Sequence, residues 1–517
     1  MSYRAHEKVD GPVVILDCEW MANLKEKVEK TPRKDVRAER ATIFQVPNNI
    51  RAGDTNHEAC SLGEAYNPKI VSLGPYHRLD EQLQVWNTRL KWPCLKRLLE
   101  RSPDNDQAIE KCIDRIKERE REVRSAYAEE FVKMTSNEFV EMLLLDCCFV
   151  LELLLELEEE KKRRKQEKVA QEKKMSTINK LLPPFKTRSK VQKQQEQPKP
   201  SAALMGSSSA RDAAPMKQPS TEEKQPEEEG TLIQQWQWAE PLIYHDLLML
   251  ENQIPLSLLR ELHGIILSHD KSPSMDELIL SFFKEFSLTK HITKIPEGSC
   301  HHLLHLFHSS LIPKKQPTTR GIRAQLVAEV TSAIPCARDL IESRVKVKKK
   351  QGVACSSFLD LSFDSGRLEI PEIHVDDGTN TLLRNLIAFE QCLPRIGDYL
   401  TTYAWFMDSV IDNSADVALL RRKHVLVSGL GSDEEVAKLF NSLCKEVMVD
   451  PNQCYLEETI KEVNKYYRSK RNRCYATLNH NYFSNPWASI SVVAAIILFV
   501  LTFIQTLYSM CDSCYKA

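Results

Sequence analysis

The longest apolar run of the chain lies near its C-terminus, where no charged residue occurs between Trp487 and Tyr508. A helix of about 20 apolar residues spans the hydrocarbon core of a bilayer, and aromatic rings at its two ends favour the headgroup layer. The alternative is a buried core helix, which would carry polar residues along one face. The polar side chains here are Ser, Thr and Gln, which a membrane helix can hydrogen-bond internally. The pattern predicts a transmembrane helix over 487–508, followed by a short tail over 509–517.

A second apolar stretch, EFVEMLLLDCCFVLELLLEL at 138–157, is apolar on most sides of a helix, which is typical of a buried helix. A second membrane span is the alternative. On the insertion scale, however, Asp146 near the centre costs about 2.5–3.5 kcal/mol, whereas each leucine contributes only about −0.5 kcal/mol. We therefore predict a core helix. Its main stripe consists of Phe139, Leu143, Asp146, Val150, Leu153 and Leu157.

Helical periodicity elsewhere predicts a mainly α-helical body. Pro255 is expected to break or restart a helix, and Ser432, followed by three acidic residues, has the pattern of a helix N-cap. One segment instead alternates apolar and polar positions around Asp364-Ser365-Gly366, which predicts a β-hairpin over 359–370. Further helices are expected at 381–393, 398–411, 415–423, 434–447 and 455–473.

Residues 158–230 depart from this pattern. Their charged first part can extend the preceding helix as a solvated rod. The remainder is rich in Pro, Ser, Gln, Lys and Glu and cannot bury enough apolar surface to become ordered. The predicted fold class is mainly α: a large helical domain over 41–480 with one small β-hairpin, a disordered insertion at 158–230, a poorly ordered N-terminus at 1–40 and the C-terminal transmembrane helix.

Length, net charge and cysteine usage limit the number of domains, the class of partner and the redox state to be expected. A length of 517 residues suggests two to four domains, and the insertion and the membrane helix reduce that number. The net charge of −1 gives no overall field toward nucleic acid, so no nucleic-acid partner is expected. The 15 cysteines are odd in number and irregularly spaced, which indicates reduced, mostly buried thiols.

Polar residues inside apolar segments are the first candidates for chemistry. The Asp146 carboxylate must be paired, hydrogen-bonded or protonated. It is either a general acid or base with a raised pKa, or a structural group that forms an ion pair or caps a neighbouring backbone. Glu251 and Asn252, with Gln253, form a polar corner before Pro255 and are expected to satisfy backbone groups that the proline frees. We favour a structural role for Asp146, because no second catalytic group is identifiable beside it. No nucleotide-binding, hydrolase or zinc-protease motif occurs in the chain either.

Two further groups of residues suggest specific chemistry. His301, His305 and His308 fall on one face of an expected helix and are weak candidates for a metal site, since no acidic partner stands at ligand spacing. No metal or other cofactor is therefore predicted. Cys511 and Cys514 adjoin the membrane span, a position that favours S-acylation over zinc binding or redox chemistry.

Charge around the span predicts its orientation. Asp512 and Lys516 are the charged residues that follow the span, so the positive excess precedes it and that side is expected to face the cytosol. The start of the chain has no signal-peptide pattern, and no Asn-x-Ser/Thr acceptor occurs. Together with the short tail, this predicts a tail-anchored protein inserted after translation. The basic residues before the span are Lys465, Arg468, Lys470, Arg471 and Arg473.

Several segments together resemble a plant family of unknown function, domain-of-unknown-function family number 247, also called uncharacterised protein family 0481. The resemblance covers the chain from about residue 40 to the C-terminus and implies a mostly helical body with a C-terminal membrane segment. It implies no catalytic residues. Family members implicated in pollen self-incompatibility of grasses make recognition or signalling plausible, and the long insertion at 158–230 departs from the family pattern. The matching segments are VSLGPYH (71–77), EFVEMLLLDCCFVLELL (138–154), DLLMLENQIP (246–255), IPCARDLIESRVKVK (334–348), LRNLIAFEQC (383–392), GSDEEVAKLFN (431–441) and NPWASISVVAA (485–495).

We therefore predict a single-pass membrane protein of plants that acts through protein interaction, recognition or signalling and is not an enzyme. Its partners are expected to be a membrane of unspecified identity and unknown proteins, with the body in the cytosol. One alternative is an enzyme of unrecognised mechanism that uses Asp146, Glu251 or the histidine face. The other is a recognition component of the self-incompatibility type whose body lies outside the cell.

Overall fold

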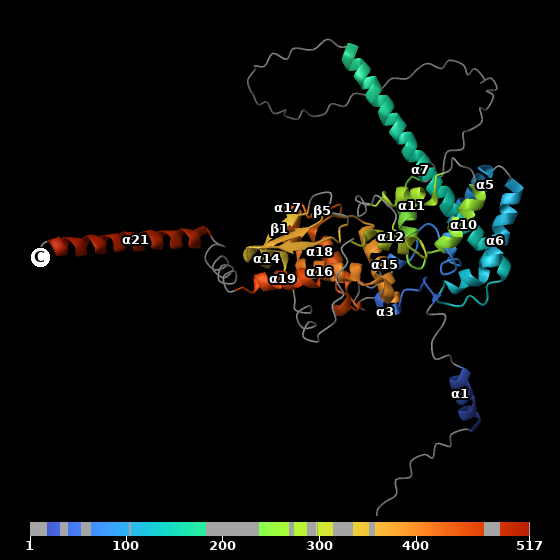
Figure 1. The fold of residues 1–517 in the computed structure, drawn as a ribbon, viewed down its shortest axis with the longest axis horizontal. Coiled ribbons are helices and arrows are strands. Elements are labelled where there is room, and N and C mark those ends of the chain that lie inside the picture. The colour runs from blue at the N-terminus through green and yellow to red at the C-terminus, as the bar shows by residue number, and fades with distance from the viewer. Residues whose placement is uncertain are drawn as a thin grey trace, which may run out of the picture. The chain divides into compact units, whose positions relative to one another are not determined.

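The structure is a computed structural model that describes residues 18–30, 40–52, 64–102, 105–181, 237–267, 273–286, 296, 298–313, 334–350, 357–469 and 486–515. The chain divides into two compact units. The first comprises residues 1–154 and 238–517, and the second comprises residues 155–237. Helices dominate the described residues, as Figure 1 shows, which confirms the predicted fold class.

The N-terminal half of the described chain is helical. Within the first unit, α6 packs against both α5 and α10. Asp80 caps α5 by accepting a hydrogen bond from the Gln82 backbone N–H at 2.9 Å. The elements are α1 (Cys18–Lys30), α3 (Asn48–Ala52), η1 (Glu64–Tyr66), α5 (Glu81–Glu100), α6 (Asn105–Ser125), α7 (Ser136–Leu181), α9 (Glu240–Asp246), α10 (Leu256–Ile266), α11 (Met275–Phe283) and α12 (Leu303–Leu311).

The predicted core helix is the first part of α7. Thr135 and Glu138 form a reciprocal cap at its start: the Thr135 N–H donates to Glu138 Oε2 at 2.8 Å, and the Glu138 N–H donates to Thr135 Oγ1 at 3.3 Å. The apolar stripe is buried, with Phe139 and Val150 both 0% exposed. The core assignment is therefore confirmed. The helix then continues through the charged residues to Leu181, so the first part of the 158–230 segment is helical.

The C-terminal half of the first unit adds shorter helices. Ser432 is the N-cap of α18 and accepts a hydrogen bond from the Glu435 N–H at 3.2 Å, as predicted. α18 packs against α15, α16 and α17. The elements are α14 (Ala337–Glu342), α15 (Thr379–Cys392), η3 (Pro394–Ile396), α16 (Tyr399–Val410), α17 (Ser414–Arg422), α18 (Asp433–Leu443), η4 (Pro451–Gln453), α19 (Glu457–Tyr467) and α21 (Pro486–Tyr515).

Five short strands form two small sheets among the described residues: β1 (Lys346–Lys349), β2 (Ser362–Asp364), β3 (Arg367–Ile370), β4 (Ile373–Val375) and β5 (Leu426–Ser428). β2 and β3 are the predicted hairpin, and its turn uses positive φ at Ser365 (48°) and Gly366 (83°). β1 extends this sheet by pairing in parallel with β3, so that the strand order is β1-β3-β2. β4 and β5 pair in parallel. The sequence did not predict β1, β4 or β5.

The N-terminal segment also differs from expectation in part. Residues 18–30 form α1 within the stretch 1–40 that we expected to be poorly ordered. Its apolar side chains Trp20, Leu24 and Val28 recur every four residues and are exposed. The rest of the insertion, 182–230, and most of 1–40 lie outside the described residues.

Candidate functional site

The polar residues predicted from the sequence are brought together in one buried network, which we call the polar clasp. It joins the side chain of α7 Asp146 and the turn after α9 to the backbone of residues 69–74. The turn is rich in polar side chains, yet it is fully inside the protein, since none of the five clasp side chains exposes more than 2% of its area. The clasp side chains are Asp146, Asp246, Glu251, Asn252 and Gln253.

Asp146 forms a buried ion pair with Lys91 of α5. Lys91 Nζ lies 2.6 Å from Asp146 Oδ1 and also donates to the Ser72 carbonyl at 2.6 Å. The second carboxylate oxygen accepts from the Gly74 N–H at 2.7 Å. Burial raises the pKa of Asp146, while the Lys91 charge and these hydrogen bonds oppose the rise. Both oxygens are therefore engaged in structural contacts.

Asp246 and Asn252 bind the backbone of the 69–73 segment. The Asp246 carboxylate accepts from the N–H groups of Lys69, Ile70 and Val71 at 2.7–3.0 Å. Burial raises the pKa of Asp246 to about 6, although the three donors favour its ionised form. Asn252 Oδ1 accepts from the Leu73 N–H at 2.5 Å, and its amide nitrogen donates to the Val71 carbonyl at 2.9 Å.

Glu251 faces a different segment. It accepts from the Val46 N–H at 2.6 Å, pairs with Arg51, and its Oε2 lies 3.1 Å from His77 Nε2. Burial alone would raise the pKa of Glu251, but the contacts with His77, Arg51 and Val46 bring it below its usual value. Like Asp146, this carboxylate is held by a basic side chain and by a backbone N–H group.

The contacts of Gln253 test the prediction that this corner satisfies backbone groups near Pro255. Its amide nitrogen donates to the Leu247 and Met249 carbonyls, and its oxygen accepts from the Leu304 N–H at 3.1 Å. The corner thus does satisfy backbone groups. These groups belong to its own turn, to α12 and to segments far away in sequence. They are not groups freed by Pro255, since Pro255 is the N-cap of α10 and interrupts no helix.

Gly74 fits the clasp because it has no side chain. Its φ is +68°, and an added Cβ would lie 2.9 Å from the Gln253 carbonyl oxygen and 3.0 Å from Tyr127 Oη. We expect Gly74→Ala to lower the free energy of unfolding by about 2 kcal/mol, since the left-handed conformation alone costs a residue with a Cβ about 1–2 kcal/mol. Urea denaturation followed by far-UV circular dichroism measures this.

Gly264→Ala is the matched control for this variant. Gly264 lies in α10, and its added Cβ would meet nothing within 4 Å. A helical glycine replaced by alanine is expected to be neutral or to stabilise by up to about 1 kcal/mol. Equal effects of the two substitutions would contradict a special requirement at Gly74.

The histidines do not converge on a metal site. α12 begins at Leu303, because His302 is its N-cap, and this places His301 outside the helix. The His301 N–H donates to His305 Nδ1 at 3.2 Å, whereas His308 Nε2 is 2.7 Å from Glu390 Oε1 in the core. Among the described residues, no group of three or more His, Cys, Asp or Glu side chains could hold a metal ion.

Glu390 of α15 is a buried carboxylate that the sequence interpretation missed. Besides His308, it accepts from the N–H groups of Leu400 and Thr401 at 2.8 Å and from the Thr401 hydroxyl at 2.7 Å. It thereby connects α12 and α15 to the first turn of α16. The sequence does contain a signal for this residue, since Glu390 directly follows the apolar run LIAF at 386–389, and a carboxylate next to apolar residues also identified Asp146.

The predicted membrane span lies within α21. Residues Ile490–Tyr508 are long and apolar enough to cross a membrane, with a mean hydropathy of 2.5. None of this stretch is buried inside the protein, and Trp487 and Tyr508 are 76% and 77% exposed. The side chains of Cys511 and Cys514 lie outside the described residues, so their acylation stays a prediction.

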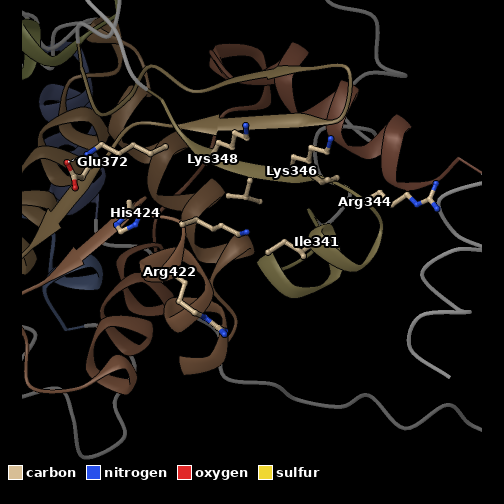
Figure 2. A pocket seen from close by; sticks show the side chains of 11 residues that line it. Ile341, Arg344, Lys346, Lys348, Glu372, Arg422 and His424 are labelled. Atoms are coloured by element: carbon tan, nitrogen blue, oxygen red, sulfur yellow. Dashed lines mark hydrogen bonds and ion pairs between the residues drawn. The ribbon is translucent and has the colours of Figure 1, made fainter. Parts of the chain in front are cut away.

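A basic hollow of about 930 Å³ gathers charged side chains from separate segments, and Figure 2 shows its lining. The cations come from the residues after α14, from β1 and from the end of α17. Glu372 is the acidic residue of the lining. The sequence analysis did not identify this hollow, because its cations lie in separate segments. They are Arg344, Lys346, Lys348, Lys349, Arg422 and Lys423, with His424 beside them.

Comparisons with known proteins agree on one family. A family model described as a plant protein of unknown function, domain-of-unknown-function family 247, matches residues 43–501. UPF0481 protein At3g47200 of Arabidopsis thaliana is 24% identical over 487 residues, which cover 90% of this chain and 86% of the relative. Putative UPF0481 protein At3g02645 of the same plant is 34% identical over 192 residues, 37% of this chain and 35% of the relative. No solved structure gives a significant match.

Proposed function

Because the chain belongs to domain-of-unknown-function family 247 of plant proteins, whose description names no activity, we propose a function from its own features. We propose that it is a single-pass membrane protein in which α21 is the anchor and the helical body binds protein partners. The observation that carries this proposal is the uncharged, predominantly apolar and unburied surface of Ile490–Tyr508.

α21 has the properties that a bilayer requires of a spanning helix. Large apolar side chains such as Phe499 (73% exposed) and Leu498 (64% exposed) point outward around it, which is costly in water and favourable in lipid. Its hydroxyl groups bond within the helix: Thr502 Oγ1 donates to the Leu498 carbonyl at 2.8 Å, and Thr506 Oγ1 donates to the Thr502 carbonyl at 2.8 Å. Internal satisfaction of polar groups suits a lipid environment.

The structural partners of the candidate acids and bases support a function in binding rather than in catalysis. Asp146, Glu251 and Glu390 are each buried and each bound to cations, histidine or backbone donors. A general acid or base must lie within hydrogen-bond reach of a substrate, whereas these groups are used to hold the fold. We therefore favour a binding surface on a rigid body over turnover by these groups.

The cytosolic orientation follows from the flanking charge. Five basic residues lie between Lys465 and Arg473, before α21, and the positive-inside tendency directs such a flank to the cytosol. Partners would then be cytosolic proteins. A protease added to intact membrane vesicles should digest the body, and full protection of the body would favour the alternative with the body outside the cell.

Removal of α21 tests the anchor. We expect the full chain to stay with membranes after carbonate washing and a chain that ends before Pro486 to remain in the supernatant. Two arginines at Ile496 and Phe499 should weaken insertion as well, since each costs about 2.5–3.5 kcal/mol at the centre of a span. Immunoblots of the two fractions measure the distribution.

The control is the same double change at two exposed apolar residues elsewhere, Leu79→Arg and Val169→Arg, which should leave membrane association intact. If the chain without α21 still sediments with membranes, the proposed anchor is wrong. Proximity labelling from the N-terminus then identifies partners, and labelling restricted to lumenal or extracellular proteins would contradict the proposed location.

A further inference from the structure

The basic hollow beside β1 has a charge distribution that favours the binding of an anion. Three separate parts of the first unit contribute cations to it, as Figure 2 shows for Arg344, for Lys346 and Lys348 of β1, and for Arg422 of α17. Val347, between the two lysines, is buried, so the strand alternation directs both lysines to the same, outer face.

Two glutamates lie near the cations of β1. Glu369 of β3 is the register partner of Lys348, and its carboxylate lies 3.8 Å from the Arg367 guanidinium. Glu372 is engaged by Lys349, whose Nζ lies 2.5 Å from Glu372 Oε2. No carboxylate of the described ranges forms an ion pair with Lys346, Lys348 or Lys423. Positive charges held together in a concave surface raise the local potential and concentrate anions there.

The backbone of β1 adds hydrogen-bond donors along the edge of the sheet. β1 is an edge of the sheet, and within the described chain no strand pairs with its outer side. The Lys346 N–H donates to the Gly366 carbonyl in the hairpin turn, and the Lys350 N–H donates to the Ile370 carbonyl of β3, each at 2.8 Å. Because successive residues of a strand direct their N–H groups to opposite sides, those of Val347 and Lys349 face outward. Exposed N–H groups at a sheet edge contribute to anion-binding concavities.

Two simpler explanations account for parts of this pattern. Lysines on an edge strand prevent pairing with another chain, and cations at the end of α17 complement its dipole. Neither explains why the strand lysines, the α17 cations and Arg344 line one hollow. A ligand with several negative groups can pair with cations from more than one of these segments.

We propose that this hollow binds a small molecule that carries several phosphate groups, such as an inositol polyphosphate or the headgroup of a polyphosphorylated inositol lipid. Lysine ammonium groups and the arginine fork are the usual partners of phosphate. The volume of about 930 Å³ lies near the upper end of the range of small-molecule sites, about 300–1,000 Å³, and is too large for one phosphate. An acidic peptide added to β1 would engage the strand edge but would not need cations from three elements.

The test measures binding of inositol hexakisphosphate to the full chain in detergent by titration calorimetry at physiological salt. We expect one saturable site that weakens as salt increases, because the contacts are ionic. The double change Lys346→Glu and Lys348→Glu should weaken binding roughly hundredfold, since each lost charge-assisted hydrogen bond corresponds to about tenfold in affinity.

Lys111→Glu with Lys117→Glu is the matched control, because it makes the same change in net charge at two exposed lysines of α6. This control should bind as the native chain does, and both double variants should keep the native thermal transition. No saturable binding, or equal weakening by the two double variants, would overturn the site.

Two arms identify the source of the phosphates. Mixed micelles containing phosphatidylinositol 4,5-bisphosphate are compared with free inositol hexakisphosphate as ligands of the same preparation. Tighter binding to the doped micelles assigns a lipid headgroup, and tighter binding to the free compound assigns a soluble ligand. Binding of a polyglutamate peptide, with neither phosphate compound bound, would replace the proposal with strand addition by an acidic peptide.

Discussion

Asp146→Leu is expected to lower the free energy of unfolding by about 3–5 kcal/mol, the cost of breaking a buried ion pair by removing one partner. The Lys91 ammonium would stay behind, only 8% exposed, with the Ser72 carbonyl as its remaining partner. The Gly74 N–H would lose its acceptor as well. Urea denaturation of the detergent-solubilised chain, followed at 222 nm, measures the difference.

The double variant Lys91→Met with Asp146→Leu separates the pair from its environment. Replacing both charges by apolar groups is often neutral, so we expect the double variant to recover about 2 kcal/mol or more of the loss. The control is Asp276→Leu, which removes a surface pair with Arg260 at 3.2 Å and should cost under about 1 kcal/mol. Additive losses at Lys91 and Asp146 would contradict direct coupling.

The same variants address the enzyme alternative. If Asp146 is structural, partner binding or activity should decline in proportion to the folded fraction of each variant. Asp146→Asn keeps the shape of the side chain and removes its charge. A stable Asp146→Asn protein that has lost all function would support chemistry at this carboxylate, and the structural interpretation would then be wrong.

Local signals explain what the sequence predicted of the fold. The core helix at 138–157 is rich in leucine and apolar on most sides, and the hairpin and the Ser432 cap depend on residues within a few positions. Each of these elements is determined by its own neighbours in sequence. That is why their position and type could be predicted correctly.

The missed strands depend on distant partners. β1 pairs with β3, which lies about twenty residues later, and β4 pairs with β5 about fifty residues later, through contacts such as Val375 with Ser428. Each strand has only three or four residues, which is too short for its periodicity to stand out. Their pairing is decided by the tertiary packing of the helices around them.

The sequence identified several residues of the candidate site but not the groups that they bind. Asp146 and Glu251 were recognisable as polar residues in apolar surroundings, and both are bound by structural partners. Those partners could not be derived from spacing, since Val46 lies 205 residues from Glu251 and Lys91 lies 55 residues from Asp146. The basic hollow was missed for the same reason: it exists only where three segments meet.

Glu390→Leu is expected to lower the free energy of unfolding by about 3–5 kcal/mol, because four buried donors would lose their acceptor and each unsatisfied group costs about 1–3 kcal/mol before the structure relaxes. These donors are His308 Nε2, the Leu400 and Thr401 N–H groups and the Thr401 hydroxyl, and the Glu390 side chain is 0% exposed. The N-terminus of α16 would lose the negative charge that complements its dipole as well.

Two further variants make this expectation specific. Glu390→Gln keeps one acceptor oxygen and should cost less than Glu390→Leu, whereas Glu369→Leu, at a more exposed glutamate of β3, should change stability by under about 1 kcal/mol. Urea denaturation gives all three values under one condition. A loss at Glu390 no larger than that at Glu369 would mean that α12, α15 and α16 are held together by apolar packing alone. A large loss would show that a single carboxylate fixes the start of α16, as the contacts of Glu390 indicate.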